Sequence, residues 1–270
     1  MHHEIISYLT TAAGAGGAAA AAVTSDSLTV RNAIPGTKAE IIQCWGRNQV
    51  AGFQGLTAPS WNDTTRGIQY TCGINTPLPQ LNYPSLQPVQ AQEPISATIG
   101  GSAVGGDIEQ GSILLWYDNV PGISGRYLDR AGMAKLAIRA VTVRLSITTT
   151  ATGAYTGSVA LNSATDLLRP NTDYALVGAS IGVACCSVGI RSPDWSNVRV
   201  GIPGMALRPD ITGDWFALLS DRVARPMIPV CNYGNKANIF VDCLQDENAA
   251  AVTLSLNLIE LQTTGVNTRG

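Results

Sequence analysis

Residues 55–68 read GLTAPSWNDTTRGI, and residues 189–202 repeat the pattern as GIRSPDWSNVRVGI. The blocks begin at Gly55 and Gly189, so the offset is 134 residues in a chain of 270. A repeat at about half the chain length indicates two copies of one structural unit. The anchors of the repeat are Pro59, Trp61, Asp63, Arg66 and Gly67 in the first copy, and Pro193, Trp195, Asn197, Arg199 and Gly201 in the second.

Similar stretches flank both blocks. Upstream, residues 35–37 (PGT) match residues 170–172 (PNT), and each is followed by an apolar run. Downstream, residues 140–147 (AVTVRLSI) match residues 251–258 (AVTLSLNL), which makes the first copy longer within 69–110. Prolines disfavour helices and central strands, so we expect residues 69–110 to form a long loop at a barrel end. The prolines concerned are Pro77, Pro79, Pro84, Pro88 and Pro94.

The composition favours a β protein that associates with other copies. Only 13% of residues are charged, against about 25% in typical domains, while 28 are Gly and 14 are Pro. This balance predicts short strands, tight turns and surface hidden in contacts. The net charge is −2, and the sequence contains no run of Lys or Arg. A basic patch or arm is what grips a nucleic-acid backbone, so we expect no direct nucleic-acid partner.

Strand patterns dominate from Ser27 onward. Residues 141–147 and 252–258 alternate apolar and polar side chains, as half-buried antiparallel strands do. Helical patterns are confined to about 129–137, 163–168 and 221–224, and no strand–helix alternation supports a parallel sheet. We predict an all-β fold of two tandem eight-stranded jelly-roll barrels, a double jelly roll with few short helices. Immunoglobulin-like sandwiches are the rival fold, but their Cys–Trp–Cys spacing is absent.

We expect the chain to divide into four parts. These are an N-terminal arm at 1–26, a first barrel at 27–148, a second barrel at 154–262 and a C-terminal tail at 263–270. In the arm, Ile5, Ile6 and Leu9 lie at helical spacing, and residues 11–22 are nearly all Ala and Gly. Each Gly costs a helix about 1 kcal/mol, and the run is too weakly apolar to span a membrane. Two interpretations stay open, a mobile tail and a short helix that packs on a neighbour or on lipid.

The sequence offers little chemistry. The histidines are His2 and His3, so a Ser–His–Asp triad is not expected. The six cysteines form no CxxC pair, and the start lacks a secretory n-region. We therefore expect no metal, no cofactor and free buried thiols in a chain folded in the cytosol. Four acidic residues could supply the paired carboxylates of a glycosidase, but such residues more often lie in solvated turns, and we expect no enzyme. They are Glu93, Asp107, Glu109 and Asp118.

The repeated block itself has a structural interpretation. We expect Trp61 and Trp195 to anchor the two barrel cores, each with a partner for its indole N–H. Arg66 and Arg199 are expected to tie loop to strand through Asp63 and Asp194. A ligand-binding arginine is the alternative.

The duplicated block, together with residues 199–239 (RVGIPGMALRPDITGDWFALLSDRVARPMIPVCNYGNKANI), carries a resemblance of architecture over residues 27–262. The chain resembles the double jelly-roll major capsid proteins of tailless icosahedral phages with an internal membrane, of the corticovirus and tectivirus kind. The resemblance implies a virion shell protein without catalytic residues, folded in the host cytoplasm. Its homotrimer places six barrels in a pseudo-hexagonal capsomer.

The same resemblance implies further partners. These are neighbouring capsomers, penton and minor capsid proteins, and an internal lipid membrane or capsomer next to residues 1–24. The alternative function is a two-barrel glycan-binding protein or glycosidase. Sugar sites use exposed aromatic residues, and aromatics make up 6% of this chain.

Overall fold

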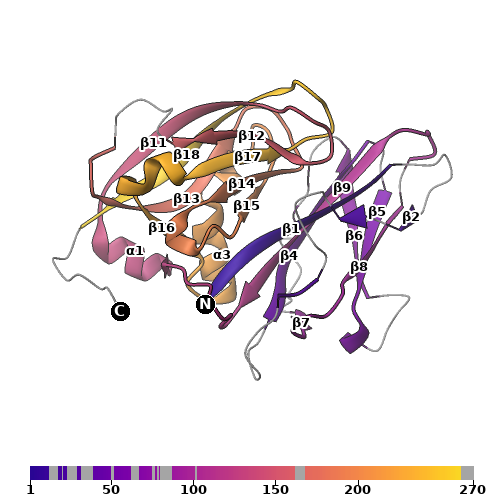
Figure 1. Cartoon of the computed structure of the whole chain (residues 1–270), viewed down its shortest axis with the longest axis horizontal. Helices are drawn as coiled ribbons and strands as arrows, with labels where there is room; N and C mark the ends of the chain where they lie inside the picture. The colour runs from indigo at the N-terminus through magenta and orange to yellow at the C-terminus, as the bar shows by residue number, and fades with distance from the viewer. Residues whose placement is uncertain are drawn as a thin grey trace.

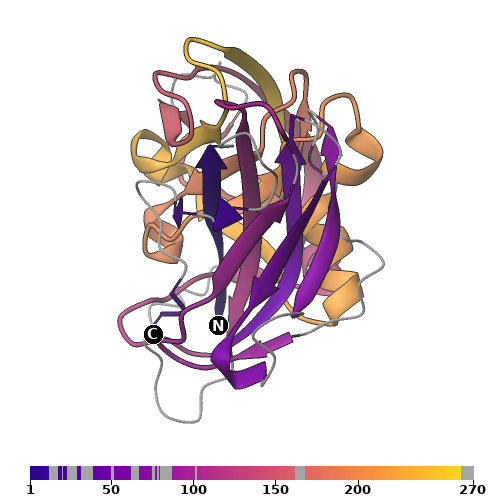
Figure 2. The same ribbon diagram turned by 90° about the vertical axis from the view of Figure 1, so that its right-hand side faces the viewer.

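A computed structural model describes residues 1–11, 18–19, 21–22, 29–31, 39–49, 52–61, 67–74, 77, 79, 87–100, 102–161 and 168–262. The fold is mostly β, as predicted, and its curled sheets form two units that lie side by side (Figure 1). When the right-hand side of Figure 1 is turned to face the viewer, the strands of the first unit lie in front of the second (Figure 2).

The first unit is one nine-stranded sheet of order β2-β8-β5-β6-β4-β9-β1-β3, with β7 paired to β4. It contains two antiparallel groups, β1-β9-β4-β7 and β2-β8-β5-β6. The strands are β1 (His2–Thr11), β2 (Ala18–Ala19), β3 (Ala21–Ala22), β4 (Ala39–Asn48), β5 (Gly52–Thr57), β6 (Ile68–Ile74), β7 (Gln87–Val89), β8 (Ser96–Gly100) and β9 (Ile108–Tyr117), with a 3-10 turn η1 (Pro59–Trp61) after β5.

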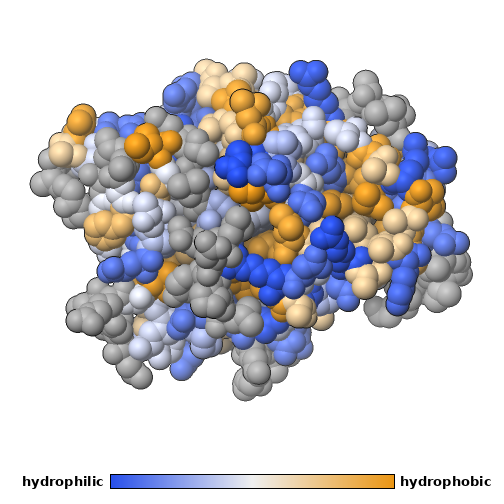
Figure 3. Space-filling view, turned by 180° about the vertical axis from the view of Figure 1, so that it is seen from behind, coloured by the Kyte–Doolittle hydropathy of each residue, from blue (hydrophilic) through white to orange (hydrophobic). Residues whose placement is uncertain are grey.

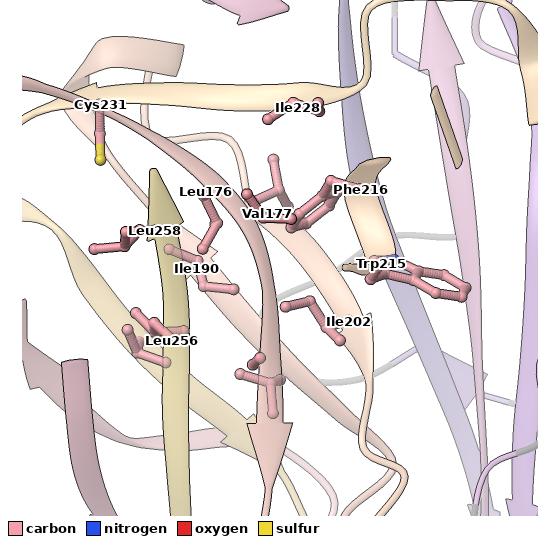
Figure 4. Packing of buried hydrophobic residues seen from close by; sticks show 14 of the residues in the cluster. Leu176, Val177, Ile190, Ile202, Trp215, Phe216, Ile228, Cys231, Leu256 and Leu258 are labelled. Atoms are coloured by element: carbon pink, nitrogen blue, oxygen red, sulfur yellow. The ribbon is translucent and has the colours of Figure 1, made fainter. Parts of the chain in front are cut away.

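The second unit has two sheets, of order β10-β16-β13-β18-β11 and β12-β17-β14-β15. Leu176, Ile190, Leu256 and Leu258 fill the space between them, and Trp215 points away towards the first unit (Figure 4). The elements are β10 (Tyr127–Leu128), α1 (Arg130–Leu136), β11 (Ala137–Thr148), β12 (Tyr155–Ala160), β13 (Asp173–Ile181), β14 (Ser187–Arg191), η3 (Pro193–Trp195), β15 (Val200–Pro203), α2 (Pro209–Thr212), α3 (Trp215–Val223), β16 (Ile228–Asn232), η4 (Tyr233–Asn238), β17 (Phe240–Leu244) and β18 (Ala251–Leu261).

The two units pair their strands in the same way. We call β1-β9-β4-β7 and β11-β18-β13-β16 the long-strand groups, and β2-β8-β5-β6 and β12-β17-β14-β15 the short-strand groups. The sequence repeat falls at matching places, β5-η1-β6 and β14-η3-β15. Even an irregularity matches, because β4 shifts register after Ile41 and β13 shifts register after Leu176, 135 residues later.

The N-terminal segment corrects one expectation. Residues 2–11 are neither a helix nor a mobile tail but β1, which lies beside β9 inside the first sheet. Ile5 and Ile6, which helical spacing would place close together, point to opposite faces of a strand. Both faces of β1 are buried from His2 to Tyr8, so the strand lacks the alternation that reveals a half-exposed one. This segment belongs to the first unit and is not a separate arm.

The similarity between the stretches 140–147 and 251–258 does not mark equivalent strands of the two units, as the sequence analysis expected. Residues 140–147 and 251–258 are not equivalent strands of two units but antiparallel neighbours in one sheet, where Val141 lies opposite Leu258. They look alike because both bury one face in the same core. β11 therefore belongs to the second unit, which begins before residue 148, and its counterpart in the first unit is β1.

Residues 69–110 are also not one long loop. They hold most of β6, all of β7 and β8, and the start of β9. Pro88 is tolerated because β7 is a three-residue strand paired to β4 at the end of its group, where a missing N–H costs little. Pro77 and Pro79 lie outside strands, Pro94 forms an isolated bridge with Thr29, and Pro84 lies outside the described residues.

The helices agree with the sequence in part. The expected helix at 129–137 is α1, whose N-cap Asp129 accepts a 2.6 Å hydrogen bond from the Gly132 amide. The helix expected at 221–224 is the end of the longer α3, and α2 was not expected. The helix expected at 163–168 falls almost entirely outside the described residues. Across the described ranges, no helix is long and apolar enough to cross a membrane.

Candidate functional site at the seam between the units

One face of the first unit's long-strand group is buried against the second unit, and we call this contact the seam. Alternate residues of β1 and β9 point to opposite sides, so Ile6 and Ile113 join the first unit's core while Ile5 and Leu114 join the second unit's. Gly201 of β15 allows the close approach, because a Cβ there would lie 2.4 Å from Ile5 Cδ1. The Ile5 amide also donates to the Arg199 carbonyl at 2.9 Å.

The centre of the seam is Trp45. Its Nε1 donates to Ser187 Oγ at 3.0 Å and to the Cys186 carbonyl at 3.1 Å, and its ring meets Trp215 edge-on with centroids 5.8 Å apart. Buried polar groups in such a contact are stabilised by hydrogen-bond partners. A row of hydroxyls supplies several of them, from Ser187 to Ser112 (2.7 Å), from Ser112 to Ser7 (2.9 Å) and from Ser7 to Tyr155 (2.8 Å).

Charged pairs close the seam at both ends. Arg47 of β4 donates to Asp246 and to Gln245 Oε1, the latter at 2.5 Å. Arg225 donates to Glu40 Oε2 at 2.5 Å, and its guanidinium lies 3.8 Å above the Trp116 ring. Each pair joins the two units in the opposite sense, because Arg47 and Glu40 belong to the first unit while Asp246 and Arg225 belong to the second. The two pairs therefore fix the position of one unit against the other.

The two histidines are buried at the start of β1. His3 Nε2 lies 2.9 Å from the Met227 carbonyl, and its ring contacts Phe216 and Tyr127. Burial lowers the pKa of His3 to about 4. His2 stacks on Tyr117 at 4.7 Å, and burial, followed by the nearby charges of His3 and Arg31, lowers its pKa to about 3. The sequence analysis placed these residues in a terminal arm, although the apolar residues Ile5, Ile6, Tyr8 and Leu9 that follow also fit a strand buried on both faces.

The repeat anchors lie at equivalent turns but differ in burial. Pro59 and Trp61 form η1, and Pro193 and Trp195 form η3. Trp195 is fully buried in the second core, and its Nε1 has no hydrogen-bond partner in the described part of the chain. Trp61 is only half-buried and donates to the Pro88 carbonyl at 2.7 Å.

The other anchors shape the turns. Gly67 has φ +46°, and a Cβ there would lie 1.9 Å from the Leu56 carbonyl, so the turn requires glycine. Asn197 also has a left-handed φ of 57°, and Gly201 belongs to the seam. Asp63 and Arg66 lie outside the described residues.

Arg199 pairs with a different carboxylate from the one expected. Its Nε lies 3.3 Å from Asp242 Oδ1 on β17, and its guanidinium lies 4.0 Å above the Tyr155 ring. Asp242 also accepts from Arg191 at 3.1 Å, and burial raises its pKa despite both arginines. Asp194 instead accepts from the Asn232 amide at 3.0 Å. Asp242 is 43 residues from Arg199, so no local pattern could find it.

The four acidic residues considered for catalysis hold loops together or face solvent. Glu93 accepts from the Ser60 amide (2.5 Å) and the Gln90 amide (2.7 Å). Glu109 accepts from the Gln49 and Ser102 amides, and burial raises its pKa. Asp107 accepts from Ser102 Oγ, and Asp118 is exposed. Among the described residues, no group of three His, Cys, Asp or Glu could hold a metal ion.

The six cysteines are free and buried. Burial raises the pKa of Cys44, Cys186 and Cys231 to about 12, which keeps these thiols protonated and unreactive at neutral pH. What the described side chains build is therefore a buried contact between two similar units, held by apolar packing, hydrogen bonds and ion pairs.

Comparisons with known proteins add little to this geometry. No family model and no curated protein matches the sequence. Weak likenesses to solved structures include the PBSX exported protein XepA (TM-score 0.27, 8% identity, 95% of this chain and 86% of that one). They also include the major capsid protein P2 from bacteriophage PM2 (0.22, 8%, 97% and 98%) and AerE from Microcystis aeruginosa (0.20, 6%, 97% and 99%). TM-scores this low do not establish a shared fold, so function has to be inferred from the molecule itself.

Proposed function

We propose that the chain is a structural major capsid protein, three copies of which form a pseudo-hexagonal capsomer of an icosahedral virion shell. The observation that carries the proposal is the duplicated strand order. The order β11-β18-β13-β16, with β12-β17-β14-β15 in the second sheet, supports an eight-stranded jelly roll, an architecture used by viral capsid domains. The first unit repeats this order with β1-β9-β4-β7 and β2-β8-β5-β6.

The seam supports assembly beyond one chain. It joins the outer face of a long-strand group in the first unit to the outer face of a short-strand group in the second. Contacts between two different faces are heterologous, and repeating them produces a closed ring when the rotation permits. Three chains of two units each would supply six similar lobes for such a ring.

The surface is consistent with a protein that buries several of its sides. Hydrophobic residues reach the surface in several groups set among hydrophilic ones (Figure 3). The large exposed ones include Phe53, Ile74, Val104, Ile138 and Leu207. We propose homotrimer partners, neighbouring capsomers, and penton and minor capsid proteins, in a virion shell assembled after folding in the host cytoplasm. Because the side chains of residues 2–8 are buried, the proposal includes no lipid contact through them.

Light scattering coupled to size-exclusion chromatography tests the trimer, and negative-stain microscopy tests the shape. The expected result is a particle of three 28.2 kDa chains with threefold symmetry and six lobes. A stable monomer at high concentration would refute the proposal. A glycan array and a hydrolysis assay on the same preparation address the alternative, and a monomer that binds or cleaves glycans would replace the capsid proposal with it.

A further inference from the structure

The two units present matching rows of residues on the outer faces of their long-strand groups. In the first unit, the row across β1, β9 and β4 is Ser7, Ser112 and Trp45. In the second unit, the row across β11, β18 and β13 is Arg144, Ser255 and Ser180. Trp45 and Ser180 are 135 residues apart, the same offset as the register shifts in β4 and β13, so Ser180 holds the place of Trp45.

The short-strand groups match in the same way. Ser187 lies two residues before Gly189, and Phe53 lies two residues before Gly55, the first glycines of the repeated blocks. Residues two apart on a strand share a face, so Phe53 holds the place of Ser187 on the outer face of its group. Ser187 is covered by the seam, whereas Phe53 is 49% exposed.

The large and the small residue exchange places between the faces covered by the seam and the faces that are open. In the seam, a large side chain from the long-strand group, Trp45, meets a small one from the short-strand group, Ser187. On the open faces, the long-strand group carries the small Ser180 and the short-strand group carries the large Phe53. A hollow of about 350 Å³ surrounds Ser180, lined also by Arg144, Ser255, Leu207 and Pro209.

We propose that Phe53 of one copy docks into the hollow at Ser180 of a second copy of this chain. The contact between chains then repeats the seam within a chain, with the large and small residues exchanged. The inference rests on the proposed function and adds to it the two faces that meet.

The chemistry of both faces fits this docking. The Phe53 ring lies over Gly100, where a Cβ would be 2.5 Å from its Cε1, and strands β5, β6 and β8 contain no charged residue. This uncharged face does not oppose the approach of Arg144, whose guanidinium can stack on an aromatic ring.

Leu207 provides the apolar wall of the hollow. It is 80% exposed and adopts a left-handed φ of 56°, which is uncommon for leucine, and its amide donates to the Ile181 carbonyl at 2.9 Å. Backbone strain of this kind is concentrated at functional contacts.

Each chain carries one open face of each kind, so the contact continues from copy to copy until a ring closes. The variants Phe53→Ser and Ser180→Trp each place two like-sized residues opposite one another. We expect each to raise the concentration at which the trimer dissociates at least tenfold in analytical ultracentrifugation. The double variant, Phe53→Ser with Ser180→Trp, recreates the Trp–Ser pair of the seam and should restore assembly.

A matched control is Val104→Ser, which removes a side chain 61% exposed in the turn between β8 and β9 and should leave the trimer intact. Circular dichroism melts of all variants check folding. A second measurement mixes the Phe53→Cys chain with the Ser180→Cys chain under mild oxidation, which should give a disulfide between two copies, since the native thiols are buried.

The outcomes separate the two proposals. If the wild type is trimeric but neither single variant weakens it and no disulfide forms, this docking is wrong and the trimer stands. If the double variant dissociates as readily as the single ones, the exchanged-size pairing is wrong. If the wild type is a monomer, both the docking and the capsid function fall.

Discussion

Ile5 and Gly201 meet across the seam with no space between them, since a Cβ on Gly201 would lie 2.4 Å from Ile5 Cδ1 and 2.8 Å from Ile5 Cβ. The Ile5 backbone cannot retreat easily, because its amide is bonded to the Arg199 carbonyl. A single methyl group at position 201 therefore tests whether the two units depend on one another.

We predict that Gly201→Ala lowers the free energy of unfolding by about 1–3 kcal/mol, the usual cost of overpacking. Urea denaturation followed by tryptophan fluorescence measures this. Gly55→Ala is the control, because a Cβ there would have its nearest neighbour at 3.9 Å, and we expect a change within about 0.5 kcal/mol. Equal losses in both variants would contradict the seam geometry.

Asp242 tests the charged network beside the seam. Its side chain is 2% exposed and accepts from both Arg191 and Arg199, so Asp242→Asn leaves two arginines without their carboxylate. We predict a loss of about 3–5 kcal/mol in unfolding free energy, typical of a broken buried pair. The matched control is Asp210→Asn, which breaks the exposed pair with Arg208 and should leave the free energy of unfolding almost unchanged, because water screens that pair.

The buried histidines predict a dependence of stability on pH. Burial lowers their pKa values from 6.5 to about 3 for His2 and about 4 for His3. Between pH 6.5 and these lower values, the unfolded chain therefore binds more protons than the folded one. Stability from this source is therefore complete above pH 6.5 and falls as the pH drops through 6.5 towards 4. For His3 alone the loss is on the order of 3 kcal/mol.

Urea denaturation at pH 7.5 and pH 5 measures this effect. The variant His3→Gln keeps a side-chain donor for the Met227 carbonyl but does not titrate, so its stability should change less between the two pH values. A wild type equally stable at both pH values would show that the rings are hydrated in solution.

Deleting residues 1–11 tests whether this segment is an essential strand or the mobile arm expected from the sequence. Without β1, both the Ile113 and the Leu114 sides of β9 lose their neighbour, so we predict loss of cooperative unfolding and aggregation on expression. A truncated chain that melts like the full-length protein would show that β1 is dispensable.

Sequence patterns determined the features that depend on one local environment. The alternation in 141–147 predicted a half-exposed strand, and β11 buries alternate residues from Val141 to Ile147. The repeated blocks located two equivalent turns, η1 and η3, and Asp129 marked the start of α1. In each case the local structure depends on interactions among a few neighbouring residues.

Tertiary structure alone decided which strands pair and what covers them. β1 has a core on each face, so no periodicity distinguished it from an apolar tail. Residues 140–147 and 251–258 resemble one another because they line the same core, and only the hydrogen-bonded register reveals them as partners. Arg199 reaches Asp242 because β14 brings β15 and β17 together. These outcomes depend on contacts between distant residues, whose free energies are set by burial and register that no local stretch of sequence encodes.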